Sequence, residues 1–147
     1  MASNRLTESL GALCIISWGG DEKPLADSIA NQMKHKPLIF PELISLSKSA
    51  ALMKQARLFI GSDSAPLHLA NLVDTQVIGL YGPKNSIIYG PFDAGQVAKP
   101  VIVRKDLPCS PCRKRTCSKP ICMESITVEE VLQQAVQLCS ERKNGKT

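Results

Sequence analysis

The stretch from Ile60 to Ala70 combines residues that suit an anion-binding turn: Ile60-Gly-Ser-Asp-Ser-Ala-Pro-Leu-His-Leu-Ala70. An apolar run comes before it, so the pattern predicts a strand that ends here and a helix that begins a few residues later. Asp63 and Ser64 can cap that helix, and Pro66 fits its first turn. The bare N–H groups and the positive end of the helix dipole suit a diphosphate, which His68 can also reach. The same residues also fit a capped helix that binds no ligand.

A second turn with features of a ligand site follows the next apolar run, in the segment Leu80-Tyr-Gly-Pro-Lys-Asn85. Gly82 has no side chain, so the backbone can approach a ligand closely at the end of a strand. Lys84 can add a positive charge near a phosphate. A simple strand-ending turn accounts for the same residues.

Four of the six cysteines lie close together, at Cys109, Cys112, Cys117 and Cys122. Four thiolates at such spacing can hold a structural zinc ion in tetrahedral geometry, and a metal would stabilise a segment that is otherwise short of regular structure. The alternative is a loop of reduced thiols, since disulfides are disfavoured in the cytosol.

The composition is that of an ordinary folded protein with a basic surface. Of the 147 residues 44% are hydrophobic, and the net charge is +5, which suits phosphates, nucleic acid or an anionic membrane surface. Aromatic residues make up 4%, so few side chains are present on which nucleic-acid bases could stack. We find no signal peptide and no apolar run of about 18 residues, and we therefore expect a cytoplasmic protein.

Strand and helix patterns alternate along the chain. Dense apolar runs, typical of strands buried on both faces, predict strands over residues 11–17, 37–40, 57–61, 76–81 and 97–104. Apolar residues at helical spacing predict helices over residues 22–36, 47–55, 62–73 and 127–141. Asp21 can cap the first of these helices, and Thr127 with Glu130 forms a capping box for the last.

This alternation indicates an α/β fold, a single Rossmann-like domain whose parallel sheet carries helices on both faces. In such sheets ligands bind beyond the carboxyl ends of the strands. We expect one domain over residues 1–147, with a core over about 11–141, an irregular cysteine-rich loop over 109–122 and a frayed tail over 142–147.

The two turn segments together resemble the signature of a known family. Gly61-Ser-Asp-Ser-Ala-Pro-Leu-His-Leu-Ala70 and then Val77-Ile-Gly-Leu-Tyr-Gly-Pro83 are similar to the motifs of glycosyltransferase family 9, the ADP-heptose:lipopolysaccharide heptosyltransferases and their relatives. The similarity continues in segments 17–22, 43–46 and 109–126. Two positions depart from the family pattern, since Ala65 stands where glycine is usual and Lys84 where threonine is commoner.

The resemblance implies the C-terminal, donor-binding half of a two-domain GT-B glycosyltransferase. In this family the active site lies between two Rossmann-like domains. The N-terminal acceptor domain, with its proposed catalytic aspartate, has no counterpart in the sequence, and neither has the Thr- and Lys-bearing phosphate segment that begins the C-terminal half. No catalytic residue is therefore expected here beyond support from Asp63 and His68, and we expect no heptose transfer by the chain alone.

The resemblance also implies which residues bind the donor, an ADP-sugar. Ser64 and Ala65 would give backbone N–H groups to the diphosphate, on which negative charge grows in the transition state. Asp63 would meet sugar hydroxyls or cap the helix, because a carboxylate repels phosphate. Glu22 would meet the ribose or adenine edge, and the adenine pocket would be lined by Leu43 and Ile44. The whole expected set is Glu22, Leu43, Ile44, Asp63, Ser64, Ala65, His68 and Gly82.

Cofactors and partners follow from the same resemblance. The family scheme requires no metal, because the helix dipole and cations stabilise the leaving diphosphate. The expected partners are the ADP-sugar and, through the missing domain, the lipopolysaccharide core acceptor, with no nucleic acid. Peripheral contact with the inner membrane and self-association through an exposed domain interface are further expectations.

Two other functions stay open on the sequence alone. One is a non-catalytic nucleotide-binding module or a truncated remnant of a transferase. The other is a small zinc-binding protein that contacts nucleic acid through the basic cluster at residues 113–115, although this leaves the segment 60–70 without a role.

Overall fold

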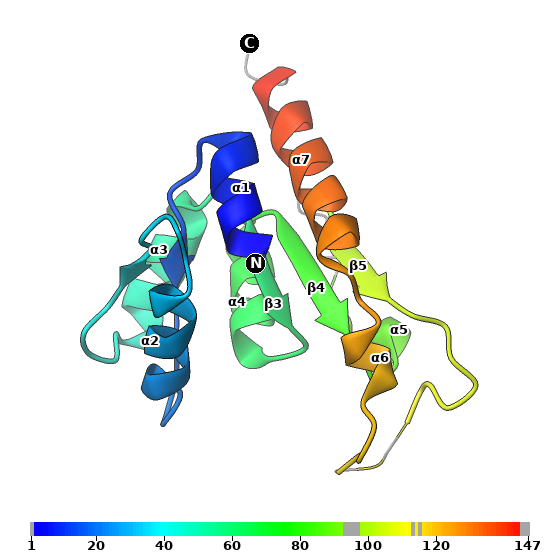
Figure 1. The fold of residues 1–147 in the computed structure, drawn as a ribbon. Helices are drawn as coiled ribbons and strands as arrows, with labels where there is room; N and C mark the ends of the chain where they lie inside the picture. Colours follow the sequence, from blue (N-terminus) through cyan, green and yellow to red (C-terminus); the bar gives the residue numbers. More distant parts are fainter. Residues whose placement is uncertain (1, 93–97, 113, 115, 145–147) are drawn as a thin grey trace.

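The computed structural model describes residues 2–92, 98–112, 114 and 116–144, and within them strands and helices alternate as the sequence predicts (Figure 1). The strands pair in parallel and form two sheets, one with the order β1-β2 and one with the order β3-β4-β5. Their bounds are β1 Ile15–Ile16, β2 Leu38–Ile39, β3 Phe59–Ser62, β4 Val77–Tyr81 and β5 Val101–Arg104.

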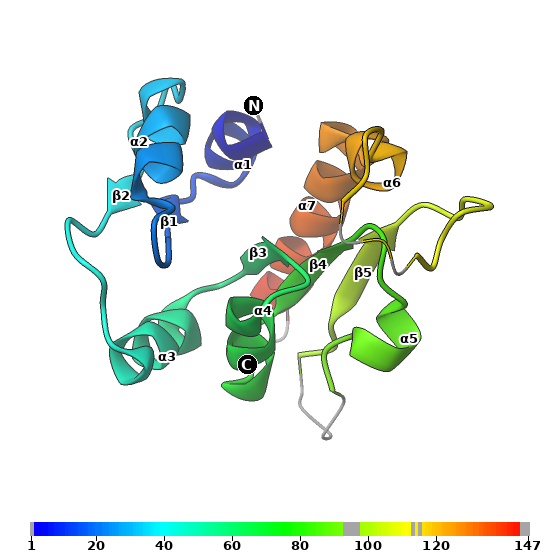
Figure 2. The ribbon, with the colours of Figure 1, turned by 90° about the horizontal axis from the view of Figure 1, so that it is seen from below.

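The helices pack on both faces of the larger sheet (Figure 2). α7 contacts β4 and β5 from one side, together with α1, whereas α4 and α3 lie on the other side. The helix bounds in the described residues are α1 Ala2–Leu10, α2 Lys23–Asn31, α3 Leu46–Gln55, α4 Ala65–Leu72, α5 Ser86–Tyr89, α6 Ile121–Glu124 and α7 Val128–Asn144. This arrangement confirms the predicted α/β fold class.

Among the described residues, a hydrophobic cluster lies on each face of the larger sheet. Successive residues of β4 point to opposite faces, as the pleat of a strand requires, so Val77 and Ile78 are both fully buried but belong to different clusters. The cluster on the α4 side contains Met53, Leu67, Ala70, Val77 and Tyr81, and the cluster on the α7 side contains Ile78, Val103 and Ala135.

The smaller sheet is less buried than the sequence predicts. The dense apolar run over residues 11–17 predicts a strand covered on both faces, yet Ile15 is 36% exposed and Leu13 66%. The prediction is wrong here because β1 pairs with β2 alone in the described residues, and its other edge borders a cavity.

Helix boundaries and phases differ in detail from the predictions. Glu22, and not Asp21, is the N-cap residue of α2, and its side chain makes no capping hydrogen bond. Of the apolar residues Leu25, Ile29 and Met33, whose spacing predicts this helix, Met33 is buried and Leu25 is exposed. The buried residues within α2 itself are Ala26 and Ala30.

Three helices are present that the sequence patterns do not predict. α1 packs against α7, α5 follows β4, and α6 begins at the end of the cysteine-rich segment. α7 continues to Asn144, so part of the expected tail over 142–147 is helical, and residues 145–147 lie outside the described residues. The capping box is confirmed: Glu130 N–H donates to Thr127 Oγ1 at 3.2 Å, and Thr127 N–H donates to Glu130 Oε2 at 2.8 Å.

Replacing Thr127 with alanine removes the acceptor for one N–H group at the start of α7. Because an N-cap hydroxyl typically contributes about 1 kcal/mol, we expect the free energy of unfolding of Thr127→Ala to fall by about that amount, measured by urea denaturation. The control is Ser140→Ala, an exposed serine of the same helix that bonds back to the Val136 carbonyl and should lose no stability. Equal midpoints for the two variants would contradict the capping role.

Candidate functional site

The carboxyl ends of β3 and β4 bring the two predicted turns together. Ser62, the last residue of β3, pairs in register with Leu80 of β4. The residues that follow these two, Asp63 and Tyr81, are therefore neighbours across the strands. α4 leads the chain from the end of β3 back to the start of β4, and the two strands are parallel, so their carboxyl ends share one edge (Figure 1). This is the edge at which ligands bind in parallel α/β sheets.

Asp63 is the centre of a cluster of polar side chains at this edge. Its carboxylate is 13% exposed, with Lys84 Nζ 2.8 Å from Oδ2 and His68 Nε2 3.6 Å from Oδ1. Lys84 and His68 are themselves 55% and 43% exposed, so both reach from solvent toward an enclosed anion. The hydrogen bond to Asp63 and its negative charge raise the pKa of Lys84. The cluster therefore places a carboxylate, an ammonium group and an imidazole together at the strand ends.

Tyr81 is the buried neighbour of Asp63 in this cluster. It is fully buried, and its hydroxyl donates to the Tyr89 carbonyl at 2.7 Å. Burial, and then the neighbouring charge of Asp63, raise the pKa of Tyr81 to about 12. The phenol therefore stays neutral at physiological pH and acts as a fixed hydrogen-bonding group below the carboxylate.

The start of α4 differs from the expected capped helix. Ser64 is the N-cap residue, but its hydroxyl donates to the Ser62 carbonyl at 3.1 Å and makes no capping bond, and Asp63 pairs with Lys84 instead. The predicted side-chain capping by both residues is therefore wrong, whereas Pro66 does lie in the first turn. Because neither side chain occupies the helix end, the Ala65 N–H stays directed out of the first turn.

Gly82 makes a close approach, but to a helix of the protein. A Cβ atom at this position would lie 2.5 Å from Met123 Sδ and 3.3 Å from Cys122 Sγ. A side chain at position 82 would therefore have to displace Met123 of α6 from the end of β4. A contact of Gly82 with a nucleotide stays a prediction.

The three remaining predicted residues lie beyond the ends of β1 and β2. Glu22 is exposed, and its Oε2 accepts from the Gly19 N–H at 3.1 Å. Leu43 is 59% exposed, and Ile44 borders the cavity between the two sheets. Trp18 Nε1 donates to the Phe40 carbonyl at 2.9 Å and so ties the two loops together.

The four cysteines of the predicted zinc site do not converge. In the part of the chain that the structure describes, no three His, Cys, Asp or Glu side chains are close enough together to hold a metal ion. Cys117 Sγ donates to the Lys119 carbonyl, Cys112 Sγ accepts from the Lys114 N–H, and Cys122 packs near Gly82. Zinc at these thiols stays a prediction that would require this loop to rearrange.

Sequence reasoning misses two polar residues at this edge and the true partner of a third. Lys84 is predicted to lie near a phosphate, but its contact is Asp63. The sequence places Tyr81 only within a strand and gives no role to Arg104 at the end of β5, which bonds Ser86 Oγ at 3.4 Å and pairs with Asp106. The signal that could find them is the position of each at a strand end, because parallel strands gather their carboxyl ends.

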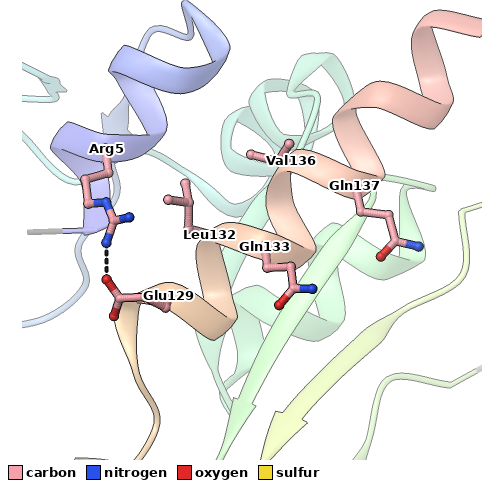
Figure 3. A pocket seen from close by; sticks show the side chains of 6 residues that line it. All are labelled: Arg5, Glu129, Leu132, Gln133, Val136 and Gln137. Carbon is pink, nitrogen blue, oxygen red and sulfur yellow. Dashed lines mark hydrogen bonds and ion pairs between the residues drawn. The ribbon is translucent and has the colours of Figure 1, made fainter.

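A separate groove of about 460 Å³ lies between α1 and α7 (Figure 3). An ion pair between Arg5 and Glu129 closes one end of it, and the other lining side chains are Leu132, Gln133, Val136 and Gln137. None of the predicted donor-binding residues lines this groove.

The fold is thus that of a Rossmann-like α/β domain with a charged cluster at its strand ends. The family model described as glycosyltransferase family 9 (heptosyltransferase) matches residues 6–122, and the chain belongs to this family. The crystal structure of a glycosyltransferase of family 9 from Veillonella parvula shares its fold, with a TM-score of 0.75 and 23% identity over 95% of this chain.

Named relatives include lipooligosaccharide heptosyltransferase 2 of Campylobacter jejuni, which is 28% identical over 86% of this chain. Lipopolysaccharide heptosyltransferase 1 of Pseudomonas aeruginosa is 31% identical over 70% of this chain. The chain covers 40% and 28% of the lengths of these two proteins, and 40% of the Veillonella chain. Among the residues described, no helix is long and apolar enough to cross a membrane.

Removing the cation from the Asp63 cluster should destabilise the fold, because the enclosed carboxylate then lacks its closest opposite charge. We expect Lys84→Gln to lower the urea midpoint more than Lys36→Gln, which changes an exposed lysine elsewhere. The loss should shrink when Lys84→Gln is made in an Asp63→Asn background, since the charge that Lys84 neutralises is then absent. Additive effects of the two changes would show that the pair is not coupled.

Proposed function

We propose that this chain is the nucleotide-sugar-binding part of a heptosyltransferase-like enzyme and that the cluster around Asp63 is its donor site. The observation that carries this proposal is the meeting of Asp63, His68 and Lys84 with the start of α4 at the carboxyl edge of a parallel sheet. Membership of glycosyltransferase family 9 supports the class of reaction.

The donor site is suited to the diphosphate of an ADP-sugar. The Ala65 N–H and the positive end of α4 favour an anion, and the ammonium of Lys84 is a point charge on a flexible stem that is 55% exposed. His68 lies in the first turns of the same helix. These groups would stabilise the charge that grows on the departing diphosphate, and no metal ion is required for that role.

Asp63 has a different role in this proposal. A carboxylate repels a diphosphate, but it accepts hydrogen bonds from sugar hydroxyls. With Asp63 holding Lys84 at 2.8 Å, the lysine is kept at the strand ends in the absence of a ligand. Binding of the donor would let Lys84 turn from the carboxylate to the phosphates while Asp63 turns to the sugar.

The smaller sheet would bind the nucleoside. Glu22 follows β1 and would meet the ribose or the adenine edge, and Leu43 and Ile44 follow β2 and would line the adenine pocket. Leu43 is exposed to solvent, which fits this role, because a bound adenine would cover its apolar side chain.

Transfer itself would require polypeptide beyond residues 1–147. The chain covers 40% of the length of the Campylobacter relative, and we assign the catalytic base and the lipopolysaccharide core acceptor site to the remainder. The complete enzyme would act in the cytoplasm at the surface of the inner membrane. A lipopolysaccharide sugar is the proposed acceptor because the named relatives are lipopolysaccharide or lipooligosaccharide heptosyltransferases.

Titration calorimetry with ADP tests the donor site. We expect the chain to bind ADP weakly, with a dissociation constant on the order of 1 mM. Lys84→Gln should weaken binding by about three- to tenfold, since a charge-assisted contact to phosphate is lost. Asp63→Asn should leave ADP affinity unchanged or raise it, because a repulsive charge is removed. Lys36→Gln is the control and should bind ADP like the unchanged chain.

Two results would contradict the proposal. One is ADP binding that neither Lys84→Gln nor Asp63→Asn alters, which would place the nucleotide elsewhere. The other is ready heptose transfer by the purified chain, which would place a complete active site within residues 1–147.

A further inference from the structure

Tyr89, the last residue of the short helix α5, faces the ammonium group of Lys84. Lys84 Nζ lies over the Tyr89 ring, 5.6 Å from the ring centroid. The same atom is 2.8 Å from Asp63 Oδ2, so one ammonium group is in reach of both an aromatic face and a carboxylate. A cation within about 6 Å of a ring centroid is attracted by the negative face of the ring. Both Tyr89 and Asp63 therefore attract Lys84 at the strand ends.

The backbone of α5 is tied to the sheet at both ends of the helix. At its start Arg104, the last residue of β5, donates to Ser86 Oγ at 3.4 Å. At its end the buried Tyr81, the last residue of β4, donates its hydroxyl to the Tyr89 carbonyl at 2.7 Å. Figure 1 shows α5 beside the carboxyl end of β4. The ring of Tyr89 is therefore carried by a segment that the ends of two strands hold in place.

The side chain of Tyr89 is not needed for this anchoring. The Tyr89 N–H donates to the Asn85 carbonyl at 2.9 Å, and the Tyr89 carbonyl accepts from Tyr81, so both bonds are made by the backbone. Tyr89 is 53% exposed, and its ring is thus only partly covered by the rest of the chain. Replacing the ring should accordingly leave α5 in position, which makes the role of the ring open to experiment.

The ring and the carboxylate act on Lys84 independently of each other. Lys84 is a flexible side chain that is 55% exposed, and Asp63 is the partner that it would leave when a donor binds. The ring belongs to α5 and does not depend on the charge of Asp63. A contact that restricts a flexible side chain before binding reduces the entropy that is lost on binding. The ring would therefore keep the ammonium group near the strand ends after the ion pair opens.

We infer that Tyr89 is a positioning residue, whose ring face holds the ammonium group of Lys84 at the carboxyl ends of β3 and β4. The contact itself rests on the geometry of the ring, the ammonium group and α5. Its effect on a nucleotide sugar rests on the proposed function, in which Lys84 binds the donor phosphates. Tyr89 then acts through Lys84 and makes no contact of its own with the nucleotide.

The competing role for an exposed aromatic side chain is direct stacking on the base of a nucleotide. The two roles differ in how they depend on Lys84. A ring that positions the lysine loses its effect on binding when Lys84 is replaced, whereas a ring that stacks on adenine keeps it. A double-mutant comparison therefore separates positioning from stacking.

The first measurement is made without ligand and follows the ε-methylene protons of Lys84 by NMR. These protons are assigned by their absence from the spectrum of Lys84→Gln. Protons above an aromatic face are shielded by the ring current, so we expect them upfield of the other lysine signals. The upfield shift should persist in Tyr89→Phe, which keeps the ring, and should be lost in Tyr89→Leu. Ile87→Ala, which changes an 88% exposed side chain of the same helix, is the control and should keep it.

The second measurement follows ADP binding by chemical-shift titration, which suits weak affinities. We expect Tyr89→Leu to weaken binding by about two- to fivefold, the effect of one exposed cation–π contact. Tyr89→Phe should restore most of the affinity, because phenylalanine has the same negative ring face. In a Lys84→Gln background, Tyr89→Leu should cause no further loss, since the cation that the ring holds is then absent.

Four results would overturn the inference. Equal shifts of the Lys84 protons in the unchanged chain and in Tyr89→Leu would show that the ring does not hold the lysine. Loss of the shift in Tyr89→Phe would assign the effect to the hydroxyl group. Full ADP affinity of Tyr89→Leu, where Lys84→Gln weakens binding, would exclude positioning, and an equal loss in the Lys84→Gln background would indicate stacking. The first measurement uses no ADP, so failure of the donor site would not be mistaken for failure of the ring contact.

Discussion

The parallel direction of the strands is the constraint on which the structure and its proposed function depend. Parallel strands with returning helices place every carboxyl end at one edge, so residues far apart in the sequence meet there. Asp63 and Lys84 are an example: they follow different strands, and the register between β3 and β4 brings them to 2.8 Å. An enclosed carboxylate is stable at that edge because the ammonium group of Lys84 faces it. The pairing of the Asp63 carboxylate with the Lys84 ammonium group is thus a consequence of the parallel register of the sheet.

Much of this fold can be predicted from the sequence, because local signals agree with the tertiary structure. The five strands lie within or next to the predicted runs, and the capping box at Thr127 forms as expected. The turn after β3 can also be found from residue types alone, since proline and small polar residues concentrate at the starts of helices. Asp63 and His68 do meet, as their spacing around the helix start allows.

The remaining features depend on information that a local pattern does not contain. The contact between Lys84 and Asp63 depends on strand register, which the sequence leaves open. Gly82 is predicted to leave room for a ligand, but α6 fills that room with Met123, a contact made across the chain. The exposure of Ile15 cannot be foreseen either, because apolar residues in a strand predict a covered strand and do not reveal that β1 pairs with β2 alone in the described residues.

Mapping ADP on the chain by backbone amide chemical shifts tests the central claim most directly, because it locates the ligand residue by residue. We expect the largest shifts on addition of millimolar ADP to fall on Ser64, Ala65 and His68, at the start of α4. Shifts concentrated in the groove between α1 and α7, or spread evenly over the basic surface, would contradict the assignment of the donor site.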